Sequence, residues 1–455
     1  MIVADILLGS LAVAVPLCFG LLVLRWLPEI AWASHWPARL ALGHLVGCGV
    51  LAWVATAYGV ASGRLRVLPV YLLLLLAGTI TRMLRAKLPL RCANRVTRPA
   101  QRSVWQTLAA EAVVIGIVTT TWALLANHSM TMDAHWNWAL KAKAFFLARS
   151  LSPIATGCCT HPNYPILIPL QSWWIYSHLH HVADLWPKAT GVLFYLDVLA
   201  LTFAACRANM QSTWAWIVTA IVANDTTQVF NAPRGMADSA VAAYILASSL
   251  FLAAYFARRN RTSRMMALLM LAGVLQTKNE GIAWAAFATL FIVIFELRSG
   301  LYKLAASSGI FVLLAAAPWT IFKHIHQLAN GPEEQMASLH TIRLEILLRM
   351  KTILLAHLTN IGPYTLPFLL VLCGPIIYYA WQWISKPVLA LLAAQFASYL
   401  VIYFVVADQI HQLSFMLRAI SQLSPALLCL SMIAWQARKA VRQAGVTSPV
   451  QAVGS

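Results

Sequence analysis

The chain has 455 residues, of which 60% are hydrophobic and only 10% are charged. Soluble domains have about 45–50% apolar and about 25% charged residues, so this composition excludes a soluble enzyme, a secreted disulfide scaffold and a disordered tail. The net charge of +19 would also fit nucleic-acid binding, but the basic loops of a membrane protein explain most of it. We therefore expect an all-α, polytopic membrane protein with no nucleic-acid partner.

Long apolar runs predict the membrane spans. The first, at 3–24, lacks a basic segment before it and a small-residue cleavage site, so we interpret it as a span and not as a signal peptide. The stretch 265–297 is interrupted by polar residues at 277–281, which predicts two short helices that meet at a polar apex. The other predicted spans are 40–61, 67–84, 106–126, 187–206, 212–230, 238–257, 304–322, 364–383, 387–407 and 414–435. Together they give about 13 transmembrane helices.

Basic residues predict the orientation. Most of the 33 Lys and Arg lie in one set of connections, which we assign to the cytoplasm of a cell with an inner membrane. The N-terminus is then periplasmic and the C-terminus cytoplasmic, provided that segment 165–182 does not span. We therefore expect that segment to be an interfacial helix with Trp173, Trp174 and Tyr176 at headgroup depth. It belongs to a long periplasmic loop, 127–186, and a second such loop follows at 323–363.

Ionisable groups at membrane depth are costly and are therefore functional candidates. Four carboxylates lie at predicted external helix ends or tight turns: Asp133, Asp238, Glu280 and Asp408. Asp133 precedes an amphipathic stretch that contains Lys141 and Lys143, and an acid beside cations and aromatic rings suits a base next to a phosphate. The alternative is that Asp133 caps a helix at 134–148 while the lysines extend toward lipid headgroups.

Further polar motifs interrupt the apolar runs. His161 to Pro165 (HPNYP) predicts a rigid turn. Asp238 opens a span, where it could be a helix cap facing Arg234. Lys278 and Glu280 share the break between two apolar helices, where they could form an ion pair. Such a break is tolerated only inside the protein or beside a cavity.

The last span has a polar face. Its polar residues recur every three or four positions: His411, Ser414, Arg418 and Gln422. Arg418 lies within the helix, and a buried Arg requires an anion, for which a phosphate is a natural partner.

Cysteine and histidine patterns give no clear metal site. The adjacent Cys158 and Cys159 are interpreted as two packing thiols. The group His178, His180, His181 and Asp184 has metal-ligand spacing, but no complementary cluster accompanies it. We expect no cofactor, with a divalent metal as an alternative that the sequence does not indicate.

Taken in order, these motifs resemble the GT-C superfamily of integral membrane glycosyltransferases, in particular the protein O-mannosyltransferase and lipid A aminoarabinose transferase group. The similarity covers about 106–435. The family motif of an Asp followed by W-x-x-K-A-K is matched by Asp133 and 138–143. The motif H-P-D-Y-P is matched by 161–165, with Asn163 in place of Asp. Residues 237–238 match A-D, and 278–281 match K-N-E-G. A T-S-x-x-R segment is matched only in part by 413–418.

The resemblance implies an inverting transfer of a sugar from a polyprenyl-phosphate donor to a glycan, lipid or protein acceptor at the periplasmic face. It implies Asp133 as the catalytic base. The donor phosphate would bind Lys141, Lys143, Lys278 and Arg418, whereas the sugar or acceptor would be positioned by Asp238, His161, Tyr164, Glu280 and His411.

The same resemblance divides the chain into three parts. Residues 1–105 are three added helices with a basic cytoplasmic loop, 106–303 are the GT-C-like core that includes loop 127–186, and 304–455 are the C-terminal helices with loop 323–363. A secondary transporter of a lipid or small solute and a non-catalytic subunit of an envelope complex are the alternatives.

Overall fold

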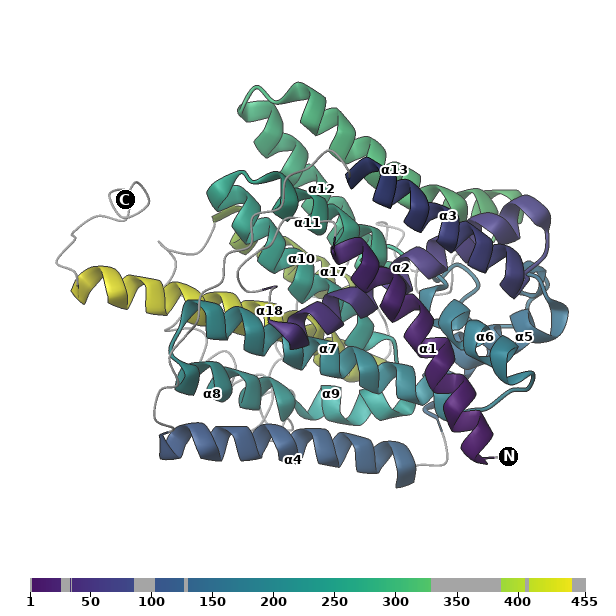
Figure 1. Cartoon of the computed structure of the whole chain (residues 1–455), viewed down its shortest axis with the longest axis horizontal. Coiled ribbons are helices and arrows are strands. Elements are labelled where there is room, and N and C mark those ends of the chain that lie inside the picture. Colours follow the sequence, from purple (N-terminus) through teal and green to yellow (C-terminus); the bar gives the residue numbers. More distant parts are fainter. Residues whose placement is uncertain are drawn as a thin grey trace.

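The computed structural model describes residues 2–25, 33, 35–85, 103–126, 130–328, 386–405 and 409–443, and every regular element in these ranges is a helix (Figure 1). The N-terminal helices are α1 (Ile2–Leu24), α2 (Trp36–Ser62), α3 (Val67–Arg85) and α4 (Val104–Ala126). The loop helices are η1 (Ala134–Ala139), α5 (Leu140–Ala148), η2 (Ser152–Ile154) and α6 (Leu167–Leu179). The central helices are α7 (Leu185–Asn209), α8 (Ser212–Ala223), α9 (Thr226–Asn231), η3 (Ala232–Arg234) and α10 (Asp238–Arg258). The remaining helices are α11 (Arg261–Val274), α12 (Asn279–Arg298), α13 (Tyr302–Ile325), α17 (Lys386–Val405) and α18 (Gln409–Gln443).

The protein is a multi-pass membrane protein. Within the described ranges, eight helices contain a stretch long and apolar enough to cross a membrane: α1, α2, α4, α7, α10, α12, α13 and α18. The outer helices α1, α4 and α13 expose rows of Leu, Ile and Val, as a surface in contact with lipid requires. The predicted span 364–383 lies outside the described residues, and the total of about 13 stays a prediction.

Of two expectations about where helices are interrupted, one is confirmed and the other is wrong. The stretch 265–297 does form two helices, α11 and α12, that meet at the polar turn. The predicted single span 212–230 is wrong, because the chain breaks into α8 and α9. The cause is Asp225, whose carboxylate accepts a hydrogen bond of 3.0 Å from the Thr227 N–H and so caps the start of α9.

Helix α6 is a helix, as predicted, but its aromatic residues do not lie at a lipid surface. Trp173, Trp174 and Tyr176 are all fully buried, because α6 packs against α1, α2, α5 and α7. The expectation of headgroup anchors is therefore wrong. These rings belong to the protein core, where burial of large aromatic side chains contributes most to packing.

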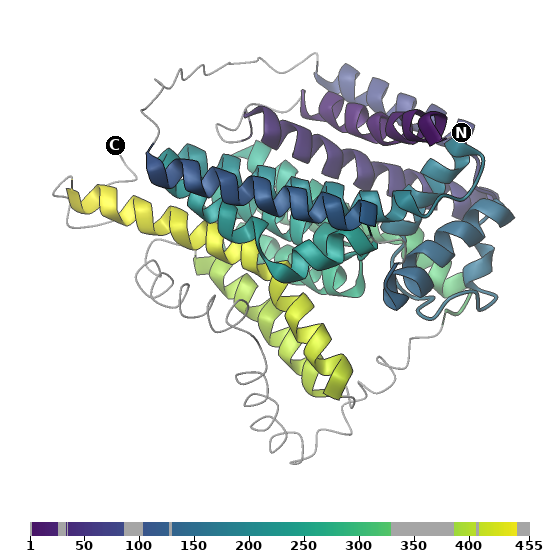
Figure 2. The same ribbon diagram turned by 90° about the horizontal axis from the view of Figure 1, so that it is seen from below.

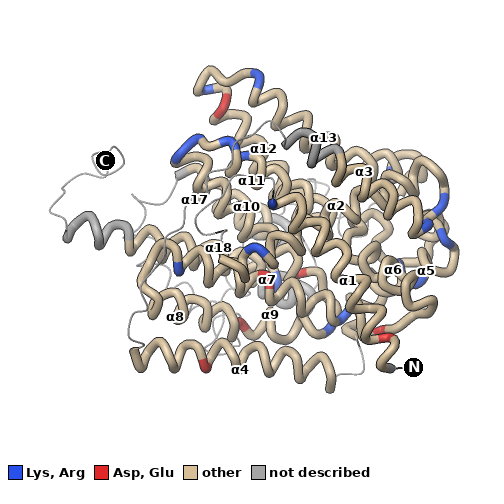
Figure 3. The backbone as a smooth tube through the Cα atoms, viewed as in Figure 1, with Lys and Arg blue, Asp and Glu red and all other residues tan. Residues whose placement is uncertain are grey.

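Helix α10 is the centre of the bundle and packs against α7, α11 and α18. Helices α1, α2 and α3 lie on one side of it and α17 and α18 on the other (Figure 2). The loop helices α5 and α6 lie together at the end of the bundle where α1 begins, whereas the C-terminal end of α18 points the opposite way (Figure 1). Most Lys and Arg positions are found at helix ends and turns (Figure 3). Which end faces the cytoplasm stays a prediction.

Prolines inside α1 and α13 fix how these helices dock. Pro16 and Pro318 have no N–H, so the carbonyls of Ala12 and Leu314 lose their helical donors. Each carbonyl accepts an indole N–H from another helix instead: Trp174 donates to Ala12 at 2.9 Å, and Trp53 donates to Leu314 at 3.1 Å. Because an unsatisfied backbone group in lipid costs several kcal/mol, these bonds hold α6 on α1 and α2 on α13.

Helices α1 and α2 approach each other closely at glycines. A Cβ atom on Gly47 would lie 1.7 Å from the carbonyl oxygen of Pro16, and one on Gly20 would lie 1.8 Å from that of Gly43. Small residues at a membrane helix contact allow the two backbones to meet in this way. The α1–α2 contact therefore has no room for a larger side chain at these positions.

We expect Gly47→Ala to destabilise the protein by on the order of 1–3 kcal/mol, because the added methyl group must push the helices apart. Gly309 in α13 is the matched control, since no atom lies within 4 Å of a Cβ placed there. Gly309→Ala should be neutral or stabilising by up to about 1 kcal/mol, because Ala is the better helix former. Thermal unfolding of both variants in the same detergent measures the difference, and equal losses would contradict the close α1–α2 contact.

Candidate active site

A buried carboxylate organises the polar interior of the bundle. Asp238 is the first residue of α10, and its side chain is 1% exposed. It accepts hydrogen bonds from the Arg418 Nε atom at 2.8 Å and from the Gln422 Nε2 atom at 2.7 Å. The Lys278 ammonium lies 3.5 Å away. A buried ionised carboxylate is stable only with such charged and hydrogen-bonding partners.

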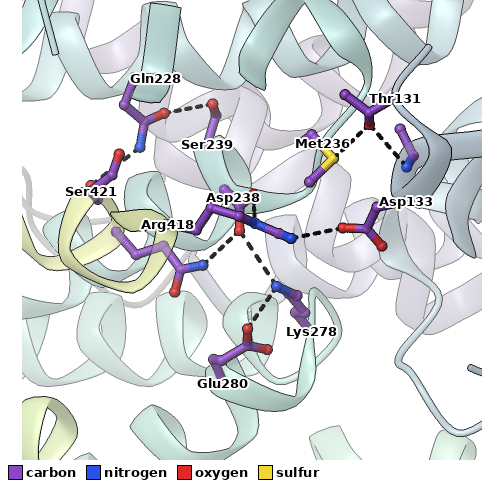
Figure 4. A network of polar contacts seen from close by, with 12 residues as sticks. Thr131, Asp133, Gln228, Met236, Asp238, Ser239, Lys278, Glu280, Arg418 and Ser421 are labelled. Atoms are coloured by element: carbon purple, nitrogen blue, oxygen red, sulfur yellow. Dashed lines mark hydrogen bonds and ion pairs between the residues drawn. The ribbon is translucent and has the colours of Figure 1, made fainter. Parts of the chain in front are cut away.

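Arg418 connects this carboxylate to Asp133 in the loop. Its Nη1 atom lies 2.9 Å from an Asp133 oxygen while its Nε atom contacts Asp238, so one guanidinium bridges two acids (Figure 4). The third nitrogen, Nη2, is buried and has no hydrogen-bond partner among the described residues. Arg418 therefore has an unused donor in a site where every charge otherwise has a counter-charge.

Two residues at the start of α12 complete the cluster: Lys278 directly before the helix and Glu280 in its first turn. The Lys278 ammonium is 2.6 Å from Glu280, so the ion pair that the sequence left open is present. Lys278 also faces Asp238, however, and thus belongs to a larger network rather than an isolated pair. The second oxygen of Glu280 is buried and accepts no hydrogen bond within the part of the chain described.

Asp133 does not cap the helix that follows it. The hydroxyl of Thr131 takes that role by accepting the Ala134 N–H at 3.1 Å, whereas the Asp133 carboxylate makes no capping bond. Its other contact is the amide of Asn137, which donates to it. The predicted helix 134–148 is present, but its first part, η1, is a π-helix that continues into α5. Such π-helical turns are frequent at functional sites.

Asp238 does not act as a helix cap either. Its carboxylate makes no capping bond at the start of α10, because both oxygens are engaged by Arg418, Gln422 and Lys278. The expected partner, Arg234, instead lies over the ring of Phe230 at 5.3 Å. The four-residue spacing of Arg234 and Asp238 has no effect here, because α10 begins at Asp238 and Arg234 ends the separate helix η3.

Lys141 lies beneath an aromatic stack next to the cluster. It is fully buried, and its Nζ atom donates to the His161 carbonyl at 2.5 Å and lies 5.7 Å from the Trp138 ring and 5.8 Å from the Tyr164 ring. The rings of His161 and Tyr164 are stacked at 4.6 Å. Burial lowers the pKa of Lys141 to about 7, although the Asp133 charge acts in the opposite direction. The alternative that Lys141 extends to lipid headgroups is therefore wrong.

One predicted phosphate ligand, Lys143, is not brought into the cluster. Lys143 pairs with Asp184 at 2.9 Å, on a half-exposed carboxylate, because it lies two positions beyond Lys141 and so on another face of α5. The side chain of His411 lies outside the described residues.

The adjacent Cys158 and Cys159 form a disulfide, so the expectation of two separate thiols is wrong. Gly157 directly before them has a φ of 82°. This left-handed residue turns the chain out of helical geometry, and the neighbouring sulfur atoms can then meet.

Two amide side chains hold the acids: Gln422, which the sequence placed on the polar face of the last span without a role, and Asn137, which it did not single out. Gln422 contacts Asp238, and its own oxygen accepts the hydroxyl of Tyr399 at 2.7 Å. Asn137 contacts Asp133, and its oxygen accepts the hydroxyl of Thr160 at 2.5 Å. Each amide lies four residues after a charged member of the cluster, and that spacing on an apolar helix was the available signal.

The histidines considered as metal ligands have other partners. His178 contacts the Tyr71 hydroxyl at 2.8 Å and the Trp174 carbonyl at 2.7 Å, and His181 lies 3.3 Å from Asp5. Across the residues that the structure describes, no group of three or more His, Cys, Asp or Glu could hold a metal ion.

The fold and the cluster define a multi-pass membrane protein with a buried, charge-balanced site at its helix ends. The site can bind an anion through Arg418, Lys278 and Lys141, and it can accept a proton at Asp133, the acid of the cluster whose side chain is 31% exposed. No known family model matches the chain, and neither a curated protein nor a solved structure shows significant similarity to it.

Arg418 and Lys143, two of the four predicted phosphate ligands, can be compared by measuring the stability of their variants. Arg418→Gln leaves the buried Asp238 with only Lys278 as its cation, and we expect a loss of about 3–5 kcal/mol. Lys143→Gln removes a half-exposed pair and should cost about 0.2–1 kcal/mol. Denaturation of both variants in one detergent gives the comparison, and a loss for Arg418→Gln as small as that for Lys143→Gln would contradict the central role of Arg418.

Proposed function

We propose that this protein is a glycosyltransferase of the GT-C type, which transfers a sugar from a polyprenyl-phosphate donor to an acceptor hydroxyl at the periplasmic face of the inner membrane, with inversion. The observation that supports this most is the meeting of Asp133, Asp238, Lys278 and Arg418 in one cluster. These residues come from four distant segments, and the resemblance of those segments to the GT-C group assigns all four to one reaction.

The position of the cluster favours a transferase over a transporter. Asp133 precedes a loop helix, Asp238 begins α10, and Lys278 precedes α12. A secondary transporter also uses the ends of broken helices, but it holds them near the middle of the membrane, whereas α10 and α12 are each long enough to cross a membrane alone. Acids at helix ends instead suit a donor whose phosphate lies at headgroup level and whose prenyl chain stays in the lipid.

Arg418 would bind the donor phosphate, and in doing so it would release Asp133. The free Nη2 atom offers the first hydrogen bond, and charge-assisted contacts of Arg to phosphate are among the strongest in proteins. The Nη1 atom lies 2.9 Å from the Asp133 carboxylate. Because phosphate and carboxylate compete for one guanidinium, donor binding frees the carboxylate before an acceptor arrives.

The released Asp133 would then act as general base. It accepts the proton of the acceptor hydroxyl while that oxygen attacks the anomeric carbon, on the face opposite the phosphate. The bond from the anomeric carbon to the phosphate oxygen breaks, and Arg418 and Lys278 stabilise the charge of the leaving phosphate. Asn137 holds the carboxylate in position. Asp238 keeps its charge throughout, as the counter-ion of both cations.

The geometry supports a role for some of the other candidate residues and not for others. Lys141 would add positive charge under the stacked rings of His161 and Tyr164, and such rings bind the apolar face of a sugar. Glu280 has a free oxygen for a sugar or acceptor hydroxyl. A phosphate role for Lys143 has no support in the geometry, since the residue pairs with Asp184.

One observation favours the transporter alternative. His44 in α2 and Asp197 in α7 form a buried pair at 2.5 Å in the interior of two spans, and intramembrane acids often serve proton or ion transport. In this structure the two groups neutralise each other and bring α2 to α7. Uptake of a labelled solute that depends on Asp197 but not on Asp133 would favour transport.

Asp133→Asn tests the catalytic assignment. Asn keeps the shape of the side chain but cannot accept the proton, so we expect transfer to fall by about 10²-fold or more. Donor affinity should stay equal or become up to about fivefold tighter, because the variant removes the competitor for Arg418. Radiolabelled sugar transfer and donor binding are measured on the same purified variant, with Asp184→Asn as the control. Transfer at near wild-type rate would remove Asp133 from catalysis.

Donor binding should depend on pH through Lys141. With a pKa of about 7, Lys141 is charged below pH 7 and loses its charge above it, whereas a phosphodiester donor stays anionic throughout. We therefore expect affinity to be constant below pH 7 and to fall above it by at most about tenfold per pH unit. Titration between pH 6 and 9 checks this. Lys141→Met should flatten the curve, and a fall of equal slope in that variant would exclude Lys141 as its source.

A further inference from the structure

A third proline interrupts a helix next to the candidate active site. Pro425 lies inside α18 and has no N–H for the carbonyl of Ser421. That carbonyl accepts a hydrogen bond of 3.2 Å from the side-chain amide of Gln228 in α9. Ser424 in the same helix makes only a longer contact of 3.4 Å to it. The arrangement repeats what Trp174 and Trp53 do at the other two prolines, but with an amide as the donor.

Gln228 uses both ends of its amide. The residue is fully buried, and its oxygen accepts the hydroxyl of Ser239 at 2.6 Å. Ser239 directly follows Asp238, and Ser421 lies one turn after Arg418 (Figure 4). The two hydrogen bonds of one side chain therefore connect the helix that carries Asp238 to the helix that carries Arg418.

We propose that Gln228 is a positioning residue for the site, which fixes α18 against α10 so that the Arg418 guanidinium can bridge Asp238 and Asp133. The proposal rests on the proposed function only in assigning a phosphate to Arg418. Gln228 lies in neither the resemblance motifs nor the set of residues that contact Asp133 or Asp238. Its role follows from the carbonyl that Pro425 leaves without a donor.

The chemistry requires an amide at this position. Leu in place of Gln228 leaves the Ser421 carbonyl and the Ser239 hydroxyl without these partners in a buried site. Glu keeps the acceptor for Ser239, but its ionised carboxylate has no donor for the Ser421 carbonyl. Pro425→Ala acts in the opposite direction, because the new N–H can bond to Ser421 within α18 and makes the amide donor of Gln228 less necessary.

The test is a double-mutant cycle in the full-length protein: Gln228→Leu, Pro425→Ala and both together. Donor affinity, kcat and thermal stability are measured for each. Gln228→Leu should lower kcat/KM by about ten- to a hundredfold, because a small displacement of a catalytic group has this effect. In the Pro425→Ala background the same substitution should have a clearly smaller effect on both stability and activity. At a pH at which its carboxyl group is ionised, Gln228→Glu should be no better than Gln228→Leu.

Trp53→Phe is the matched control. It removes the equivalent donor from the carbonyl freed by Pro318, in a part of the protein away from the cluster. It should lower thermal stability and leave kcat and donor affinity unchanged at temperatures well below unfolding. A purely structural role for Gln228 would give the same pattern, with stability lost and activity kept.

The outcomes distinguish a failure of the proposed function from a failure of the positioning role of Gln228. A wild-type protein that neither binds polyprenyl-phosphate sugar nor transfers it overturns the proposed function, while non-additive stability in the cycle would still support the Gln228 bond. An active wild type with an equally active Gln228→Leu variant overturns the positioning role. Equal effects of Gln228→Leu on stability in the two Pro425 backgrounds overturn the bond to Ser421 itself.

Discussion

The burial of Asp238 is the constraint on which the polar interior of this protein depends. A carboxylate with 1% exposure at the start of a central membrane helix requires cations, and the chain supplies Arg418 from α18 and Lys278 from the turn before α12. Removing charges from water is so costly that these three segments must meet if the fold is to form. The same need leaves Arg418 within reach of Asp133, so the charge balance of the core and the composition of the candidate site have one cause.

A second constraint is that backbone carbonyls in an apolar environment must find hydrogen-bond donors. Pro16, Pro318 and Pro425 each free a carbonyl, and each of these carbonyls is paired with a side chain from another helix: Trp174, Trp53 and Gln228. In water such a carbonyl would simply be hydrated, but within lipid it must find a donor. The prolines therefore act as specific docking points between helices whose surfaces are largely apolar.

The site combines tight charge balance with a few unused groups. Arg418 Nη2 and Glu280 Oε2 are buried without partners in the described residues, while the partly exposed Asp133 closes the network on its outer side. A protein built only for stability would satisfy such groups. Their presence beside a partly charged, buried lysine is what the binding of a polar, anionic ligand would explain.

The sequence by itself determined the class of protein, the helices with long apolar runs and the polar breaks between them, because hydropathy and helix punctuation are local properties. It also selected Asp133, Asp238, Lys278 and Arg418, since charges are rare in an apolar chain. It could not decide that Asp133 faces Arg418 rather than the end of its own helix, or that Lys141 is buried and Lys143 is not. Nor could it show that the aromatic residues of α6 face the core, or that Gln228 and Gln422 hold the cluster. Those outcomes depend on which helices pack together, and partners distant in sequence settle the fate of each polar group only when the tertiary structure has formed.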